Sequence, residues 1–368
     1  MAEESKNNLR EKAKQRLSSR IRKKETVQAK HWAREWLDAI LFAFIAALII
    51  RTFFIEAYRI PTPSMEQTLL TGDFLLVSKV HYGARTPMSL GVPFTNIHLR
   101  GVQLPWFRFP GFMDVRRNDI VVFNYPIDTD IISQKTNYIK RAVGIPGDTL
   151  AIRDKVLYVN HEQAEFYSTF EQTYEVFVAD RLRLSPSRVQ SAGGQIRQQS
   201  GSNYIINMNE ESARIIESWQ EVKEVRPAVL PESFNDFGRQ PFTFARAFRG
   251  NHHNMPDFVV PFRGQEIELT AENWNLYRDV IERYERNSVS RNGDVFVING
   301  EETNRYVVQK DYYFMMGDNR DNSEDSRFWG FVPEDHVVGR ASIIYFSWDG
   351  NSRMPRLSRV FTRIHGIR

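Results

Sequence analysis

The chain has no cysteine among its 368 residues. It can therefore form neither a disulfide framework, nor a thiolate nucleophile, nor a cysteine-ligated zinc site. Histidine is also scarce: there are eight, and none stands in an HExxH or GxSxG setting. Any catalytic base is therefore expected to be another side chain. We expect neither a metal nor a cofactor.

Excess positive charge is confined to the N-terminal segment. The whole chain carries a net charge of +4, but residues 1–35 contain eleven Lys and Arg against five Asp and Glu, which leaves −2 for the remainder. A nucleic-acid-binding body would need basic residues clustered on a folded face. The sequence thus argues against nucleic acid as a partner, and anionic lipid is the expected partner of the basic segment.

One stretch has the length and composition of a membrane-spanning helix. It runs from Trp36 to Ile55 with the sequence WLDAILFAFIAALIIRTFFI, about as long as a hydrocarbon core is thick. The positive-inside rule places residues 1–35 in the cytoplasm and the rest of the chain across the membrane. A cleaved signal peptide fits poorly because Ile55 occupies a position that needs a small residue. A buried core helix is the other alternative, and neither alternative explains the basic segment.

The remainder of the chain is rich in short β-type runs. Asp73–Val80, Asp119–Phe123, Asn137–Val143 and Gly339–Asp349 are examples, and turn residues separate them. The sequence therefore predicts a mainly β catalytic body.

Residues 161–293 have a different texture. Apolar residues recur at helical spacing in Glu210–Lys223 and Ala271–Asn287, and Gln190–Asn203 is polar and suggests a mobile loop. We expect an α-rich insertion between the lysine motif and the GDNRDNS motif described below. The expected domains are a basic cytoplasmic tail (1–35), a transmembrane signal anchor (36–56), a β-rich peptidase domain (57–160 and 294–368) and an inserted α-rich domain (161–293).

Ser64 is a candidate nucleophile in the run IPTPSM, nine residues beyond the apolar segment and hence at the bilayer surface. Pro61 and Pro63 fix φ on both sides of Thr62. The resulting stiff loop is expected to direct the Ser64 N–H and the Thr62 hydroxyl toward one point, as an oxyanion hole requires. Serine is also a common turn residue in Pro-rich loops, and for Ser64 alone that interpretation stays open.

Lys140, in the run YIKRAVGIPGD, is the candidate base for Ser64. A lysine can remove the serine proton only when its amine is neutral, and burial among apolar side chains can lower its pKa from about 10.4 by up to about 3 to 5 units. Apolar residues surround Lys140 in the sequence. Arg141 is adjacent but should face the other side of the strand. An ordinary surface lysine on a strand is the alternative.

The run GDNRDNSEDSRFWGFVP, from Gly317 to Pro333, is the third motif. It fails as a calcium loop, because Arg320 and Ser323 occupy positions where an EF-hand needs a ligand and a glycine. Its dense charges are typical of a buried ion-pair scaffold. Ser323 could hydrogen-bond the Lys140 amine and orient it. A solvated acidic turn is the alternative.

These motifs, together with DIVVF and GRASIIYFSWD, resemble in order and character the sequence boxes of bacterial type I signal peptidases, the leader peptidase family with a serine/lysine dyad. The resemblance covers the membrane segment and residues 57–83, 116–160 and 294–349. It implies that Ser64 is the nucleophile and Lys140 the general base, with Ser323 beside that lysine and Thr62 assisting the oxyanion hole. The residues expected to give structural support are Arg141, Asp318, Asp325 and Arg327.

The resemblance also implies a substrate and a location. Members of this family remove signal peptides from exported preproteins by cleaving after small residues. We therefore expect a single-pass protein of the inner (cytoplasmic) membrane, with its catalytic domain on the periplasmic or extracytoplasmic side. Shallow substrate pockets that exclude large side chains could be lined by apolar residues near the dyad, although core packing is the alternative for each of them. These residues are Tyr58, Ile60, Met65, Tyr138 and Ile139.

Two other functions remain in view. One is a catalytically inactive, membrane-anchored binding protein of the same fold. The other is a self-cleaving serine/lysine repressor, which the membrane helix and the lack of a DNA-binding segment disfavour. The aromatic-rich residues 86–113 could contact lipid or pack on the body.

Overall fold

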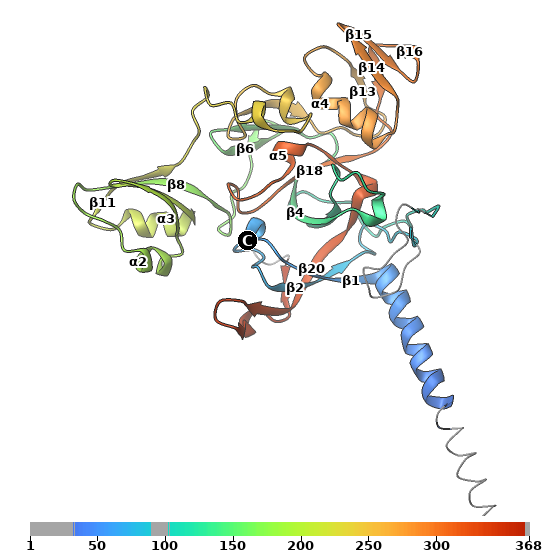
Figure 1. Cartoon of the computed structure of the whole chain (residues 1–368), viewed down its shortest axis with the longest axis horizontal. Helices are drawn as coiled ribbons and strands as arrows, with labels where there is room; N and C mark the ends of the chain where they lie inside the picture. Colours follow the sequence, from blue (N-terminus) through green and yellow to red (C-terminus); the bar gives the residue numbers. More distant parts are fainter. Residues whose placement is uncertain (1–31, 33, 90–101, 103, 365–368) are drawn as a thin grey trace, which may run out of the picture. The chain divides into compact units, whose positions relative to one another are not determined.

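The computed structural model describes Trp32, residues 34–89, Val102 and residues 104–364. Most of the basic segment expected at 1–35 lies outside these residues. The chain divides after Phe53 into two units. The first contains all but the last residue of the helix Arg34–Phe54, drawn in blue in Figure 1, which is long and apolar enough to cross a membrane. The helix ends in a π-helical turn, η1 (Ile50–Phe54).

The second unit, Phe54–Arg368, is built on a nine-stranded antiparallel sheet, which confirms the mainly β body. The strand order is β1-β2-β20-β3-β4-β18-β19, and β21 and β22 also pair with β20. Its strands are β1 (Ile55–Arg59), β2 (Asp73–Ser78), β3 (Ile120–Asn124), β4 (Asn137–Gly144), β18 (Tyr312–Met316), β19 (Val332–Pro333), β20 (Val337–Asp349), β21 (Met354–Pro355) and β22 (Thr362–Arg363).

Apolar side chains cover both faces of this sheet. In β3, Ile120 and Val122 join one buried cluster, whereas Val121 and Phe123 join another, because successive strand residues point to opposite faces. A strand buried on both faces has no polar side, which explains the continuous apolar run IVVF. Lys140 pairs with Val121 across β3 and β4. The base candidate therefore lies on a central strand of the sheet.

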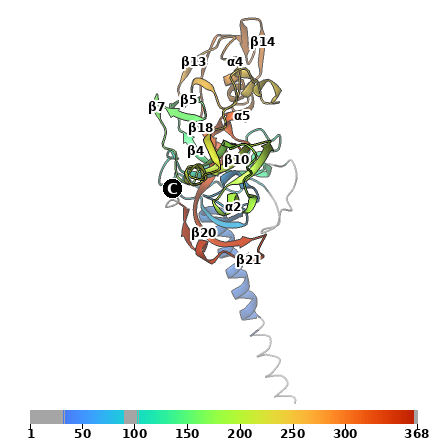
Figure 2. The same cartoon turned by 90° about the vertical axis from the view of Figure 1, so that its left-hand side faces the viewer.

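Residues 161–293 differ from the expected α-rich insertion, whose helical character is not confirmed. A four-stranded antiparallel sheet in the order β11-β8-β10-β9 dominates the first half, and it forms a green lobe with two short helices in Figures 1 and 2. Its own apolar cluster includes Val176, Ile206 and Ile216. The elements are β8 (Glu171–Val178), α2 (Pro186–Ser191), β9 (Gln195–Ser200), β10 (Asn203–Asn209), α3 (Glu210–Glu217) and β11 (Val222–Pro227).

Two local expectations fail here for physical reasons. The helix expected over Glu210–Lys223 ends at Glu217, because Val222–Pro227 pairs with β8 as a strand. The polar stretch Gln190–Asn203 is not a loop but contains β9, which pairs with β10. Five of the six side chains of β9 are exposed. The strand therefore lacks the apolar alternation by which a half-buried strand is recognised in sequence.

The second half of this region joins smaller sheets. β12 (Met255–Val259) pairs with β5 (Thr149–Arg153), which continues to β6 (Val156–Val159) and β7 (Glu162–Gln163). The helix expected over Ala271–Asn287 is confirmed in part, as α4 (Trp274–Asp279) followed by the π-helical turn η6 (Val280–Tyr284). The remaining strands are β13 (Glu266–Glu268) with β17 (Arg305–Val307), and β14 (Val289–Asn292), β15 (Val295–Ile298) and β16 (Glu301–Glu302).

Candidate active site

Ser64 lies in a tight 3-10 turn, η2 (Pro63–Met65), in the connection from β1 to β2. Pro63 starts the turn, where its fixed φ is favourable and its missing N–H is not needed. Thr62 precedes the turn with an extended backbone, and its exposed hydroxyl does not cap the turn. Ser64 itself is buried, with 8% of its surface exposed. The two prolines thus hold the buried residue Ser64 and the exposed residue Thr62, which stand on either side of Pro63.

Lys140 reaches Ser64 from strand β4. Its Nζ donates to Ser64 Oγ over 2.5 Å, and the residue is only 4% exposed. Burial lowers the pKa of Lys140 to about 8, and the nearby carboxylates of Asp325 and Asp318 offset part of this effect. The amine is therefore mostly protonated at neutral pH, but about a tenth of it is neutral at pH 7, and this reactive fraction grows as the pH rises.

Arg141 points to the other face of β4 and forms a buried ion pair with Asp318. The pair is bidentate, with Nε to Oδ1 at 2.8 Å and Nη2 to Oδ2 at 2.7 Å. Thr68 Oγ1 also donates to Asp318 Oδ2 over 2.6 Å. Two parallel hydrogen bonds fix the relative orientation of the groups as well as their separation. Lys140 is therefore kept apart from the guanidinium next to it in the sequence.

A second bidentate pair stiffens the loop that follows β18. Arg327 donates to both Asp325 oxygens, over 2.8 and 2.9 Å, and the Gly317 N–H donates to Asp325 Oδ2 over 3.0 Å. Burial alone would raise the pKa of Asp325, but Arg327 and these hydrogen bonds outweigh it and lower the pKa. The acid therefore stays ionised, and the loop has a charged anchor at neutral pH.

This loop also holds the main chain of the Ser64 turn. The Asn319 N–H donates to the Ser64 carbonyl over 3.1 Å, and Asn319 Nδ2 donates to the Pro63 carbonyl over 3.2 Å. A Cβ at Gly317 would lie 2.6 Å from the Ser64 carbonyl oxygen, so only glycine fits this approach. Sequence reasoning missed Asn319. The only indication of its role in the sequence was its position next to Asp318 in the charged run GDNRDNSEDSRFWGFVP.

Ser323 lies next to Gly317 but does not hydrogen-bond Lys140. Its buried hydroxyl makes no hydrogen bond of normal geometry among the described residues, although it contributes to lowering the pKa of Asp325. The Lys140 amine instead makes its hydrogen bond to Ser64. The expected contact between Ser323 and Lys140 is thus not formed in this structure.

The five expected pocket residues are divided between two clusters. Ile60 and Met65 are 2% and 1% exposed and belong to the cluster against which Tyr58 and Ile139 pack. Tyr138 instead packs in the cluster that contains Phe123. The two most buried residues therefore act as core in this structure, which is the alternative that the sequence left open, while the other three are only partly buried.

One group of side chains has the composition of a metal site. Ligand atoms of His252, His253 and Asp321 lie within 4.8 Å of one another. However, the Leu230 N–H donates to His253 Nδ1 over 2.9 Å, which leaves the ring proton on the Nε2 that faces Asp321. Asp321 also binds Lys155 at 2.7 Å. His253 and Asp321 thus already hydrogen-bond each other, and His252 Nδ1 pairs with Asp236, so the group is better described as a polar network than as a metal site.

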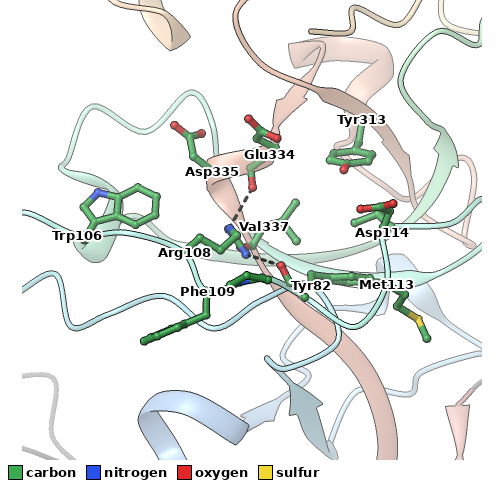
Figure 3. Close-up of a pocket in the computed structure, with 13 residues that line it drawn as sticks. Tyr82, Trp106, Arg108, Phe109, Met113, Asp114, Tyr313, Glu334, Asp335 and Val337 are labelled. Carbon is green, nitrogen blue, oxygen red and sulfur yellow. Dashed lines mark hydrogen bonds between the residues drawn. The ribbon is translucent and has the colours of Figure 1, made fainter.

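The structure describes the aromatic-rich segment 86–113 except for residues 90–101 and 103. In the described part, an arginine binds the body and two aromatic rings are exposed. Arg108 donates to the carbonyls of Glu334 and Tyr82 beside a cavity of about 540 Å³ (Figure 3). Phe107 and Phe112 are 57% and 85% exposed. The segment therefore packs on the body through its arginine while presenting aromatic rings to its surroundings.

A buried lysine within hydrogen-bond distance of a serine, on a mainly β body, is the arrangement of a serine/lysine hydrolase. Residues 33–227 and 259–348 match the family model described as signal peptidase, peptidase S26. The chain belongs to this family and is a serine endopeptidase. The resemblance stated from five sequence motifs is thereby confirmed.

Proteins named signal peptidase I are similar to nearly the whole chain. That of Aquifex aeolicus is 26% identical over 335 residues, which cover 91% of this chain and 92% of the relative. That of Buchnera aphidicola from Baizongia pistaciae is 28% identical and covers 86% of this chain and 80% of the relative. That of Buchnera aphidicola from Acyrthosiphon pisum is 30% identical and covers 84% of this chain and 73% of the relative.

Proposed function

We propose that this protein removes signal peptides from exported preproteins by hydrolysing the peptide bond after a small residue. Ser64 is the nucleophile and Lys140 the general base. The observation that carries the proposal is the 2.5 Å contact between Lys140 Nζ and Ser64 Oγ in a buried site. The family membership of the chain and the names of its relatives support the substrate class.

The reaction follows from the protonation state of Lys140. When its amine is neutral, its lone pair accepts the Ser64 proton as Oγ attacks the carbonyl carbon of the substrate. The ammonium then donates that proton to the departing amine, and an acyl-enzyme remains on Ser64. The amine, neutral again, takes a proton from water as the water oxygen attacks the ester carbonyl carbon. The ammonium then returns this proton to Ser64 Oγ as the bond between Oγ and the acyl carbon breaks, which releases the carboxylic acid product and restores the free enzyme.

The geometry of the Ser64 peptide unit supports an oxyanion hole. The Ser64 N–H shares a planar trans peptide with the Pro63 carbonyl, so the two groups point in opposite directions. Asn319 Nδ2 binds that carbonyl over 3.2 Å, which fixes the direction of the N–H. The Thr62 hydroxyl, one residue before Pro63, is exposed and serves as the second donor.

Substrate selection rests on the surface around the dyad. We propose that the pocket for the small residue is formed by Tyr58 and Ile139, with Ile60 and Met65 as its floor. Tyr138 packs in the other cluster, and in this proposal its ring, with its centroid 5.6 Å from Lys140 Nζ, borders the dyad. The floor residues are buried in the free protein. A floor that is already close-packed leaves little depth for a large side chain, which fits cleavage after small residues.

The peptidase domain comprises, in this proposal, residues 57–160 and 294–368, because both members of the dyad and the loop after β18 come from these ranges. Residues 161–293 are an insertion. The helix Arg34–Phe54 is the single membrane anchor, with residues 1–35 in the cytoplasm and the body beyond the inner membrane. Its apolar length and the eleven basic residues before and at its start support this topology.

A catalytically inactive binding protein of the same fold is the alternative. The contact between Ser64 and Lys140 disfavours it, because a scaffold needs no buried lysine with a lowered pKa. An inhibitor that acylates activated serines distinguishes the two functions. We expect it to label the purified full chain in detergent, and to leave the Ser64→Ala variant unlabelled. An unlabelled wild-type chain would favour the binding protein.

A further inference from the structure

Arg320, in the loop after β18, is a buried cation without a counter-ion among the described residues. It is 6% exposed, and its Nε has no hydrogen-bond partner. The nearest carboxylates are already engaged: Asp318 binds Arg141, and Asp325 binds Arg327, each through two hydrogen bonds. Arg320 therefore remains the surplus positive charge of this loop.

A buried charge of this kind is unfavourable unless something pairs with it. Burial lowers the pKa of Arg320 to about 10, so the guanidinium is still protonated at neutral pH. The ring of Phe170, with its centroid 4.4 Å from Cζ, offers partial compensation through a cation–π contact. Such a contact leaves the Nε–H without an acceptor, and the N–H groups of a guanidinium form a fork that matches a carboxylate.

Arg320 lines a cavity of about 190 Å³ that has an apolar floor and a second arginine, Arg117, which is already paired with Asp148 at 2.7 Å. This volume corresponds to roughly six water-sized groups. The floor consists of buried residues, namely Val143, Leu157, Val159 and Phe170. Glu162 and Glu165 also line the cavity; both are exposed, so water weakens but does not remove their repulsion of an anion.

Arg320 also lines a second cavity, of about 300 Å³, whose walls carry three carboxylates, those of Asp154, Glu165 and Glu210. The other cation there, Lys155, is held by Asp321 at 2.7 Å. The second cation of each cavity is thus already paired, Lys155 with Asp321 and Arg117 with Asp148. An anion would meet three carboxylates in this cavity but two in the smaller one, and would be repelled more strongly here. The charges therefore favour the 190 Å³ cavity.

We propose that this cavity binds a small monocarboxylate that carries a short apolar group. The carboxylate pairs with the Arg320 guanidinium, and the apolar group lies on the floor made by Val143, Leu157 and Val159. A single negative charge fits better than a phosphate dianion, because Glu162 and Glu165 stand at the same cavity. This site lies on the face of β4 toward Arg141 and is separate from the Ser64 and Lys140 contact.

Butyrate is a suitable probe, since it has one carboxylate and a three-carbon apolar chain. Equilibrium dialysis of radiolabelled butyrate against the purified full chain in detergent, at constant ionic strength, is expected to show one saturable site per chain. Butanol and butylamine, which lack the negative charge, should not compete, whereas unlabelled butyrate should. Absence of saturable binding by the wild-type chain would overturn the proposal.

Substitutions locate the site. Arg320→Met is expected to reduce bound butyrate at least tenfold without lowering the Tm of the free protein, because it removes an unpaired buried charge. Arg305→Met serves as the matched control, since Arg305 is an exposed arginine paired with Glu266 elsewhere, and it should bind butyrate like the wild type. Equal binding by the wild type and Arg320→Met would contradict the assignment.

Glu165→Gln gives an independent test that does not depend on the folding of the arginine variant. If a free carboxylate occupies the site, removing this neighbouring negative charge should tighten butyrate binding severalfold and leave the Tm unchanged. If Glu165 is instead the natural partner of Arg320, the substitution should lower the Tm of the free protein. That second result would overturn the proposal.

Discussion

The Asn319 N–H donates to the carbonyl of Ser64 over 3.1 Å, so the loop after β18 directly holds the main chain of the nucleophile. The Asn319 side chain extends this contact to Pro63. Ser64 and Asn319, more than 250 positions apart in the chain, are thereby held next to each other. The ion pairs of Asp318 and Asp325 stiffen the loop from which Asn319 acts.

Asn319→Ala tests whether this contact positions the nucleophile. The variant loses the side-chain bond to Pro63 but keeps the main-chain bond to Ser64. Because one hydrogen bond contributes about 1 kcal/mol, we expect kcat on a precursor peptide to fall by roughly five- to tenfold with KM little changed. Asn322→Ala, in the same run, is the control and should retain wild-type kcat. A normal kcat in Asn319→Ala would show that the main-chain bond alone suffices.

The pH dependence of cleavage follows from the lowered pKa of Lys140. The base is active only when neutral, so kcat/KM, which reports the free enzyme, should rise as pH increases through about 8, the pKa of this buried amine. Ser323→Ala should shift this rising limb or lower its plateau if Ser323 orients the amine. The measurement is kcat/KM between pH 6 and pH 10, the range about two units either side of that pKa. A flat profile across this range would contradict a lysine base.

The same pKa makes a prediction for stability. Between pH 8 and the ordinary lysine pKa near 10.5, the unfolded chain binds a proton that folded Lys140 does not, so the wild type gains stability as pH rises. Below pH 8 the amine is protonated in both states, and the full burial penalty is present. Lys140→Met lacks this penalty and should be more stable than the wild type at pH 7, by roughly 3 kcal/mol.

The difference in the free energy of unfolding between the wild type and Lys140→Met should narrow as pH increases from 8 to 10.5. Denaturant unfolding of both proteins at several pH values measures it. A gap that stays constant over this range would mean that the Lys140 pKa is not lowered by folding.

Thr62→Val tests the second oxyanion donor. The substitution keeps the branched shape but removes the hydroxyl, so we expect kcat to fall by roughly 10² to 10³ with little change in KM. Thr62→Ser keeps the donor and should be nearly silent. If the valine variant turns over at the wild-type rate, Thr62 has no part in the mechanism.

Exposed aromatic rings near the segment 86–113 predict contact with lipid. Replacing Phe107 and Phe112 with serine should weaken binding of residues 54–368 to phospholipid vesicles, while hydrolysis of short peptides in solution persists. Leu182→Ser removes an exposed apolar residue elsewhere and serves as the control. Vesicle sedimentation gives the measurement. Unchanged binding by the double variant would assign these rings to packing or to another partner.

The features that could be predicted from the sequence are those encoded in contiguous runs. The apolar helix, the β runs and the motifs around Ser64 and Lys140 each carry their own local pattern. Successive side chains of a strand point to opposite faces, so the sequence also predicted that Lys140 and Arg141 face opposite sides of β4, as they do in the structure.

The features that escaped prediction depend on long-range partners. β9 is a polar strand whose only signal is its pairing with β10, and Val222–Pro227 becomes a strand through pairing with β8. Burial of Ile60 and Met65 could not be separated from a pocket without knowing what packs on them. The roles of Asn319 and Arg320 follow from which neighbouring groups are already paired, and sequence spacing does not reveal this.

The central claim is that Ser64 and Lys140 act as one catalytic unit. Its most direct test is the kcat/KM of the purified full chain in detergent on a precursor peptide, measured for the wild type, Ser64→Ala, Lys140→Ala and the double variant. We predict that each single variant loses at least about 10⁴-fold and that the double variant is no worse than either, since residues of one unit are not additive. Turnover within about tenfold of the wild type in either single variant, or losses that multiply in the double variant, would contradict the account.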